Sequence, residues 1–174
     1  AQVALVERIG ALGLHRRQTI VWHETFGNYT DANFTDCARF IHYYTTTPTC
    51  VWHADAIRIP SDRQTKYADA RAVTAGKVPS NVWTFPRLVG NAAERLEGFP
   101  TQLPRDLVER IIRVASNPGD LVIDPFSGTG TTGHACLAAG RRYLGIEAVK
   151  RNVEFSRLRL QAAAAQIAPE KKTA

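Results

Sequence analysis

One glycine-rich segment constrains the fold of this chain more than any other part of its sequence. Gly128, Gly130 and Gly133 spell the pattern G-x-G-x-x-G between an apolar run at 121–123, which predicts a strand, and a predicted helix over 131–139. The first two glycines allow positive φ and a close approach of the backbone to a ligand, and the helix start points free N–H groups the same way. This order of strand, glycine loop and helix predicts a nucleoside-binding site in an α/β fold.

An acidic residue stands at the end of the next predicted strand, 143–146. This residue, Glu147, lies 19 positions after Gly128. A carboxylate at this place can accept hydrogen bonds from both hydroxyls of a ribose. With a last helix over 149–166, the segment predicts half of a doubly wound fold, in which both strands are buried on both faces. A Walker phosphate loop is excluded because no Lys follows the last glycine.

Two ligands compete for this loop, NAD and S-adenosylmethionine. An NAD loop normally opens with glycine directly after the strand, whereas here residues 124–127 intervene. Asp124, at the carboxyl end of the strand, suits an ammonium group and would be unfavourable beside a pyrophosphate. Only 27 residues follow Glu147, which is too few for the second half of a dinucleotide fold. These observations favour S-adenosylmethionine.

Composition narrows the class of protein further. The chain has 174 residues, 44% of them hydrophobic, and a formal net charge of +6. Disorder throughout is not expected with this apolar content, and no apolar run is long enough to span a membrane. The three cysteines, Cys37, Cys50 and Cys136, are widely spaced and odd in number. We therefore expect no disulfide framework and a reducing, cytoplasmic location.

The patterns divide the chain into four parts: residues 1–53, a basic segment 54–100 with no regular hydrophobic period, the cofactor-binding half 101–167 and a tail 168–174. In the first part we expect a helix over 3–12 and strands over 18–22 and 38–45. Irregular segments as long as 54–100 are uncommon unless they carry function. Basic side chains in it are candidates for contacts to DNA phosphates, against the alternative of a solvated surface. These candidates are Arg58, Arg63, Lys66, Arg71 and Lys77.

Several segments resemble the amino-group DNA methyltransferases, which methylate the exocyclic nitrogen of adenine or cytosine. Residues 124–132, Asp-Pro-Phe-Ser-Gly-Thr-Gly-Thr-Thr, resemble the family's cofactor motif, and 141–147 resemble the next motif with its ribose-binding acid. Residues 99–104 resemble the segment that precedes the cofactor loop. The sequences 19–22 and 39–44 resemble late strands of the catalytic half, which precedes the cofactor half in the permuted beta class.

The resemblance implies an α/β, Rossmann-like methyltransferase fold that uses S-adenosylmethionine, with double-stranded DNA as the partner; a homodimer is left open. It also implies a set of cofactor-binding residues: Thr101, Gln102, Asp124, Pro125, Phe126, Ser127, Gly128, Thr129, Gly130, Thr131, Thr132 and Glu147.

The sequence departs from this family at one motif. The family's catalytic Asp (or Asn or Ser)-Pro-Pro-aromatic should precede 3–12, but no Pro-Pro occurs and the first proline is Pro48. The chain also has no Met. We therefore expect that the fold is incomplete and that an N-terminal catalytic segment is missing and acts as a partner of this chain. We also expect that the chain contains no catalytic residue and does not transfer methyl groups by itself. By resemblance, a lost strand lies beside 121–123, so the two halves should have no direct strand-to-strand link.

Other functions remain as alternatives to a site-specific DNA methyltransferase of restriction and modification. One is a non-catalytic module that binds S-adenosylmethionine or DNA in regulation, and a weaker one is an NAD oxidoreductase. A zinc site at Cys37, His42, Cys50 and His53 is not favoured, because Cys37 and His42 point to opposite faces of a strand, and we expect no metal ion. Aromatic residues could stack on an extruded base, although core packing is the default for them: Trp22, Trp52, Trp83, Tyr43 and Tyr44.

Overall fold

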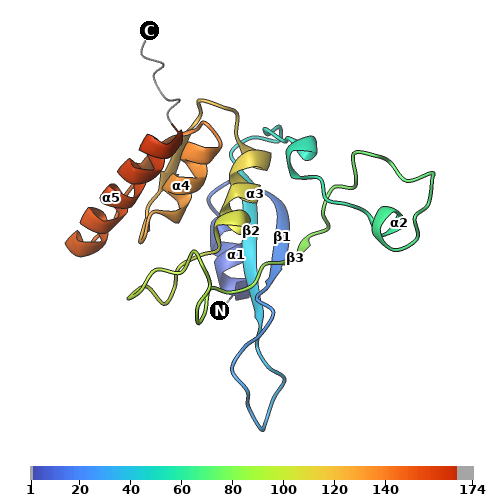
Figure 1. The fold of residues 1–174 in the computed structure, drawn as a ribbon, viewed down its shortest axis with the longest axis horizontal. Helices are drawn as coiled ribbons and strands as arrows, with labels where there is room; N and C mark the ends of the chain where they lie inside the picture. Colours follow the sequence, from blue (N-terminus) through green and yellow to red (C-terminus); the bar gives the residue numbers. More distant parts are fainter. Residues whose placement is uncertain (1, 168–174) are drawn as a thin grey trace. The chain divides into compact units, whose positions relative to one another are not determined.

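The computed structural model describes residues 2–167 and divides the chain into two compact units, Ala1–Arg87 and Leu88–Ala174 (Figure 1). The strands of these residues form two separate sheets, a three-stranded one in the first unit and a two-stranded one in the second.

The first unit is built on a β-hairpin. Its elements are α1 (Gln2–Gly10), β1 (His15–His23), β2 (Ala38–Thr45), the 3-10 helix η1 (Ala54–Ile57), α2 (Asp62–Thr65) and β3 (Val82–Thr84). β1 is the central strand: it pairs antiparallel with β2, with Ile20 opposite Ile41, and parallel with β3, with Trp22 opposite Trp83. Figure 1 shows the loop between β1 and β2 extending away from the strands.

Part of the segment that the sequence marks as irregular joins this sheet through β3. The strand is too short to show a period, and its pairing with β1 depends on residues about 60 positions away, which a local pattern cannot report. Trp22 and Trp83 are each only 6% exposed. Their indole N–H groups donate to the carbonyl oxygens of Phe85 and Ser80, at 2.8 and 2.7 Å. These two tryptophans are core residues, as the default for aromatic residues predicts, whereas Trp52, about half exposed, stacks on Tyr43.

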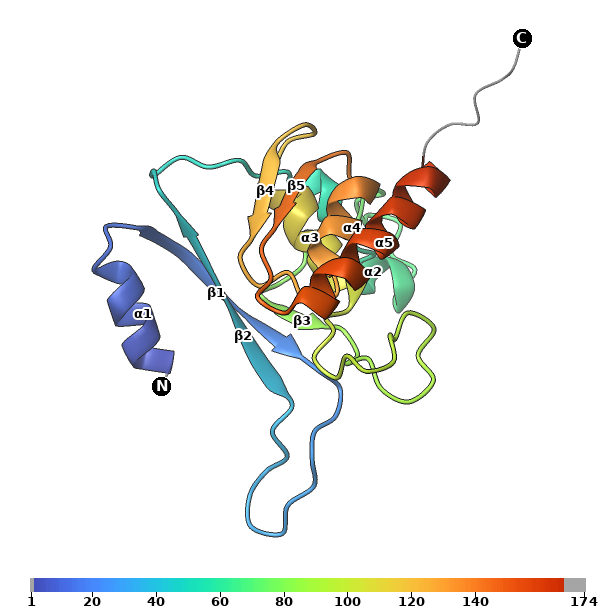
Figure 2. The ribbon, with the colours of Figure 1, turned by 90° about the vertical axis from the view of Figure 1, so that its left-hand side faces the viewer.

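The second unit has a strand–helix–strand–helix order preceded by a helix. Its elements are α3 (Arg105–Ala115), β4 (Leu121–Asp124), α4 (Thr131–Ala138), β5 (Arg142–Gly145) and α5 (Lys150–Ile167). β4 and β5 are parallel, with Val122 opposite Tyr143. In Figure 2 the three helices lie on one side of these strands. The core on that side is made of Val108, Ile112, Ala135 and Cys136, against which Val122, Ala139 and Tyr143 pack.

The other face of the β4–β5 sheet is exposed, so the prediction of strands buried on both faces is wrong. Leu121, Ile123, Leu144 and Ile146 are between 47 and 56% exposed. Successive side chains of a strand point to opposite faces, and α3 and α4 cover only the face that carries Val122 and Tyr143.

The boundary between the two units, after Arg87, falls inside the predicted segment 54–100. Residues before this boundary join the sheet of the first unit through β3. Residues 94–102 belong to the second unit, where the side chain of Gln102 bonds to the backbone of Glu94 and Leu96. The predicted tail, 168–174, lies outside the described residues. Among residues 2–167, no helix combines the length and the hydropathy needed to cross a membrane.

Candidate functional site

The loop between β4 and α4 is a tight turn that depends on two glycines. Gly128 and Gly130 have φ of 51° and 76°, as the glycine pattern predicts. The N–H of Gly130 donates to the carbonyl of Ser127 at 2.8 Å, and the N–H of Phe126 donates to Oδ1 of Asp124 at 3.0 Å. Both ends of the turn are therefore fixed by short local bonds.

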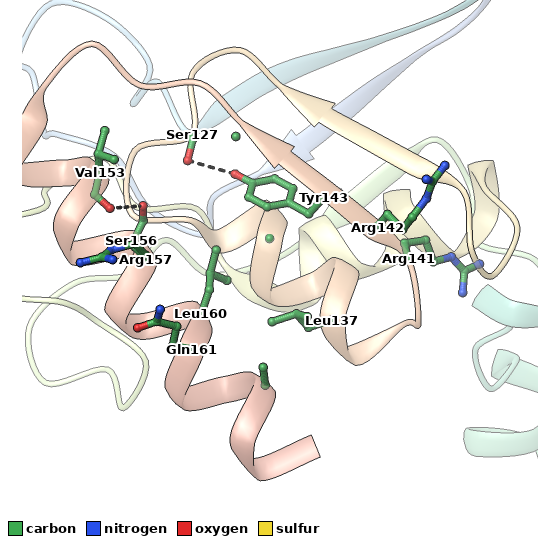
Figure 3. Close-up of a pocket in the computed structure, with 13 residues that line it drawn as sticks. Ser127, Leu137, Arg141, Arg142, Tyr143, Val153, Ser156, Arg157, Leu160 and Gln161 are labelled. Carbon is green, nitrogen blue, oxygen red and sulfur yellow. Dashed lines mark hydrogen bonds between the residues drawn. The ribbon is translucent and has the colours of Figure 1, made fainter. Parts of the chain in front are cut away.

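The third glycine allows α4 to lie directly against its neighbours. A Cβ atom at Gly133 would come within 2.6 Å of the Tyr143 ring and 2.8 Å of Leu160. The Tyr143 hydroxyl in turn donates to Oγ of Ser127 at 3.0 Å, the dashed line between these two labelled residues in Figure 3. The start of α4 is thus packed on β5 and α5, and β5 is tied to the loop.

Glu147 lies against this loop, where the sequence expects a ribose acceptor. Its Oε2 accepts the N–H of Gly128 at 2.8 Å, and its Oε1 accepts the N–H of Val149 at 2.9 Å. The N–H groups of Val149 and then of Gly128 lower the pKa of the Glu147 carboxyl below its usual value. The Asn152 side chain and the Ala148 N–H lower the pKa further by smaller amounts. The group is therefore ionised near neutral pH.

A cavity of about 300 Å³ opens beside the loop, entirely within the second unit. Its walls come from 99–103, the glycine loop and α5: Phe99, Thr101, Gln102, Leu103, Asp124, Phe126, Ser127, Gly128, Thr129, Thr131, Thr132 and Asn152. Of the predicted cofactor residues, only Pro125, Gly130 and Glu147 are not part of this lining. Phe99, Leu103 and Asn152 were not among the predicted residues, and nothing in the local pattern of α5 marks Asn152.

Gln102 has a structural task besides lining the cavity. It is buried, its Nε2 donates to the carbonyl of Glu94 at 2.7 Å, and its Oε1 accepts the N–H of Leu96 at 2.8 Å. Both ends of the amide therefore hold residues 94–102 together. The Glu94 carboxylate in turn accepts the N–H of Arg105 at 3.2 Å, at the start of α3.

The predicted DNA-contacting side chains fall into two groups, all in the first unit. Three have anionic partners on the protein: Arg58 pairs with Asp55 at 2.6 Å, Arg71 with Asp69 at 3.0 Å and Lys77 with Asp62 at 3.9 Å. Arg63 and Lys66, on and just after α2, are exposed and form no ion pair within residues 2–167. These two charges are the most available to a phosphate.

The cysteines and histidines of the first unit are not arranged as a metal centre. No three His, Cys, Asp or Glu side chains of the described residues lie close enough together to hold a metal ion. Cys37 and Cys50 are free thiols, each partly exposed.

Comparison with known proteins places this geometry in a family. Residues 3–157 match a family of N6 and N4 methyltransferases described as DNA methylase. The chain belongs to this family. The resemblance stated from the sequence is thereby confirmed.

Curated members of the family are longer than this chain. It is 46% identical over 94 residues to the DNA adenine methyltransferase YhdJ of Escherichia coli (strain K12), an alignment that covers 54% of this chain and 32% of that protein. It is 32% identical over 157 residues to the type II methyltransferase M.BglII of Bacillus subtilis, covering 84% of this chain and 42% of the relative. The chain thus spans less than half the length of either relative.

Solved structures of DNA methyltransferases share the fold. The M1.HpyAVI–SAM complex superposes with a TM-score of 0.62 at 22% identity, covering 91% of this chain and 69% of the other. The cytosine-N4-specific PvuII DNA methyltransferase gives 0.64 at 17% identity, covering 94% and 61%. These likenesses confirm the Rossmann-like α/β methyltransferase fold that the sequence predicts.

Proposed function

We propose that this DNA methylase family member is part of an S-adenosylmethionine-dependent, site-specific DNA methyltransferase that acts on the exocyclic amino group of adenine or cytosine. The observation that carries the proposal is the cavity beside the glycine loop, which places Asp124 and the start of α4 along one wall. Glu147 is bonded to the same loop through Gly128.

The residues around the cavity fit the chemistry of this cofactor. The Asp124 carboxylate can pair with the ammonium of the methionine part, and an anion at this strand end disfavours a pyrophosphate. The Glu147 carboxylate, ionised and held at the loop by backbone N–H groups, can accept hydrogen bonds from the ribose hydroxyls. The volume of about 300 Å³ lies at the lower end of the range for small-molecule sites. A relative of the same fold has been solved with SAM.

When bound, S-adenosylmethionine supplies a methyl group on a sulfonium. The contribution of this chain is to bind and orient that donor, which lowers the entropic part of the barrier. The amino group of a base also needs hydrogen-bond acceptors and an aromatic face once it is out of the stack. No Pro-Pro-aromatic loop occurs between residues 1 and 174. We therefore propose that transfer requires an upstream catalytic segment, in the same chain or as a second polypeptide.

Double-stranded DNA is the proposed macromolecular partner, and the cytoplasm is the proposed location. Arg63 on α2 and Lys66 directly after it are exposed charges without an ion-pair partner among residues 2–167, which supports contacts between these side chains and DNA phosphates. The match to M.BglII, named a type II methyltransferase, supports a role in restriction and modification.

Calorimetric titration tests the cofactor assignment. S-adenosylhomocysteine should bind the full chain with one site and NADH should not, while Gly128→Asp should abolish binding, because it puts a side chain and a second anion at a residue with φ of 51° beside Glu147. Binding of NADH without binding of S-adenosylhomocysteine would favour an oxidoreductase instead.

A second measurement tests the reaction. Tritiated methyl groups should enter duplex DNA only when the upstream segment is supplied together with the chain. Incorporation by the 174-residue chain alone, above the Gly128→Asp background, would refute the need for that segment. Binding of S-adenosylhomocysteine without any transfer by the complete protein would instead support a non-catalytic regulatory module.

A further inference from the structure

A guanidinium from α5 reaches under the glycine loop. Arg159 is partly buried, and its Nη1 donates to the carbonyl oxygen of Thr129 at 3.0 Å and lies 3.4 Å from Oγ1 of Thr131. The hydroxyls of these two threonines are themselves 3.2 Å apart. Both threonines are buried, and both line the candidate cofactor cavity.

These contacts fix one peptide unit at both of its ends. Its carbonyl, from Thr129, is held by Arg159, and its N–H, from Gly130, is held by the carbonyl of Ser127 at 2.8 Å. Gly130 has φ of 76° and precedes the first residue of α4. Glycine has few steric limits on φ and ψ, so its own backbone does not fix the orientation of the peptide before it. Hydrogen bonds to that peptide therefore decide how the N–H groups at the start of α4 are directed.

The same face of α5 also packs against the glycines. A Cβ atom at Gly130 would lie 3.0 Å from Cβ of Ser156, and one at Gly133 would lie 2.8 Å from Cδ1 of Leu160. Ser156, Arg159 and Leu160 are three and four positions apart, so they share one side of the helix. Figure 3 shows Ser156 and Leu160 on α5 beside the pair formed by Ser127 and Tyr143.

The charge of Arg159 has few favourable partners besides the loop. Burial lowers its pKa, Glu94 favours its charged form and Arg105 opposes it. Burial, Arg159 and Arg105 all lower the pKa of His134, which keeps that ring neutral. A guanidinium remains ionised in proteins, and burying it is costly unless its donors are bonded. The Thr129 carbonyl and the Thr131 hydroxyl accept hydrogen bonds from it.

We propose that Arg159 is a positioning residue of the cofactor site: it holds the Thr129–Gly130 peptide in the orientation that the methyl donor requires, without touching the donor. The inference rests on the proposed function, because S-adenosylmethionine is the ligand that the oriented loop would bind.

The experiment compares three variants of the full chain: Arg159→Met, which keeps the length and removes the donors; Arg159→Lys, which keeps the charge and one donor; and Arg157→Met as the matched control. Arg157 is exposed on the same helix, and its side chain forms no ion pair within residues 2–167. The readouts are the dissociation constant of S-adenosylhomocysteine, amide exchange at Gly130 and the melting temperature.

Arg159→Met should raise the dissociation constant about tenfold, the effect of losing one hydrogen bond to a charged group. Exchange at the Gly130 amide should become faster, because the peptide is released at its carbonyl end. Arg159→Lys should recover part of both effects, and Arg157→Met should match the unmodified chain. In the complete enzyme, the KM for S-adenosylmethionine should rise while the KM for DNA stays within about twofold, since the proposal assigns the loop to the cofactor alone.

A lower melting temperature for Arg159→Met with unchanged affinity and unchanged Gly130 exchange would show that Arg159 is only structural. If Arg159→Met does not fold, the Lys variant decides, because unchanged affinity and exchange in it would refute the proposal. If the unmodified chain binds no S-adenosylhomocysteine, the proposed function fails, and Gly130 exchange still reports whether Arg159 holds the loop.

Discussion

The backbone N–H of Gly128 donates to Oε2 of Glu147 at 2.8 Å, although the two residues are 19 positions apart. Gly128 follows β4 and Glu147 follows β5, so one carboxylate connects the carboxyl ends of both parallel strands. Its other oxygen accepts the N–H of Val149, just before α5. The proposed ribose acceptor is therefore also a brace for the loop.

Removal of this carboxylate should weaken cofactor binding. Glu147→Ala should weaken binding about tenfold or more, as expected for the loss of hydrogen bonds to a charged group. Glu147→Gln keeps one carbonyl acceptor and should lose less. Calorimetric titration with S-adenosylhomocysteine measures both effects, and an unchanged affinity in Glu147→Ala would remove this residue from the site.

The pH dependence of binding follows from the lowered pKa of Glu147. With a folded-state pKa below its usual value of 4.5, the carboxylate stays ionised as the pH falls toward that value. Its contribution to loop stability is present above 4.5 and is lost as the pH falls through the lower, folded-state pKa. Affinity measured from about pH 8 down to about pH 5 should therefore show no step from this group. A step in the unmodified chain that disappears in Glu147→Gln would contradict the assignment.

The unpaired charges near α2 should bind phosphates rather than read sequence. Arg63→Ala or Lys66→Ala in the complete enzyme should lower affinity similarly for all duplexes and reduce the salt slope by ~0.9 for each lost contact. Arg71→Ala is the control, because the guanidinium of Arg71 is already bonded to Asp69. Binding isotherms at several salt concentrations give the slopes. Loss of sequence discrimination with an unchanged slope would mean that these residues contact base edges.

Gly133→Ala should destabilise the second unit even though alanine is the better helix former. The added methyl would meet the Tyr143 ring at 2.6 Å, and overpacking of a core costs about 1–3 kcal/mol, which exceeds the helix preference of roughly 0.5–1 kcal/mol. Gly10→Ala is the control, since a Cβ atom at Gly10 would have no neighbour within 4 Å among the described residues. Urea unfolding measures the free energies, and equal values for the two variants would show that α4 can shift.

The glycine loop could be predicted because its constraints are local. Positive φ at Gly128 and Gly130 and the place of Glu147 follow from residue type and spacing, as does the order of strands and helices in the second unit. The contributions of Asn152 and Arg159 could not be predicted, because they depend on how α5 lies against the loop.

The burial of strand faces, the pairing of a short strand and the formation of ion pairs could not be predicted from the sequence. The apolar run 121–123 indicates a strand correctly, but it cannot show whether one face or both will be covered. β3 has three residues, and its pairing with β1 depends on contacts across the chain. The charges of Arg58 and Arg71 look available in the sequence, yet nearby aspartates pair with them in space.

The bare face of the β4–β5 sheet has a consequence for handling the protein. Leu121, Ile123, Leu144 and Ile146 form an apolar surface on a sheet of only two strands, and each strand pairs on one side alone within the described residues. Open strand edges beside apolar side chains are templates for aggregation. The second unit expressed by itself should therefore precipitate as its concentration rises, and Leu121→Lys together with Leu144→Lys should keep it in solution without disturbing the glycine loop.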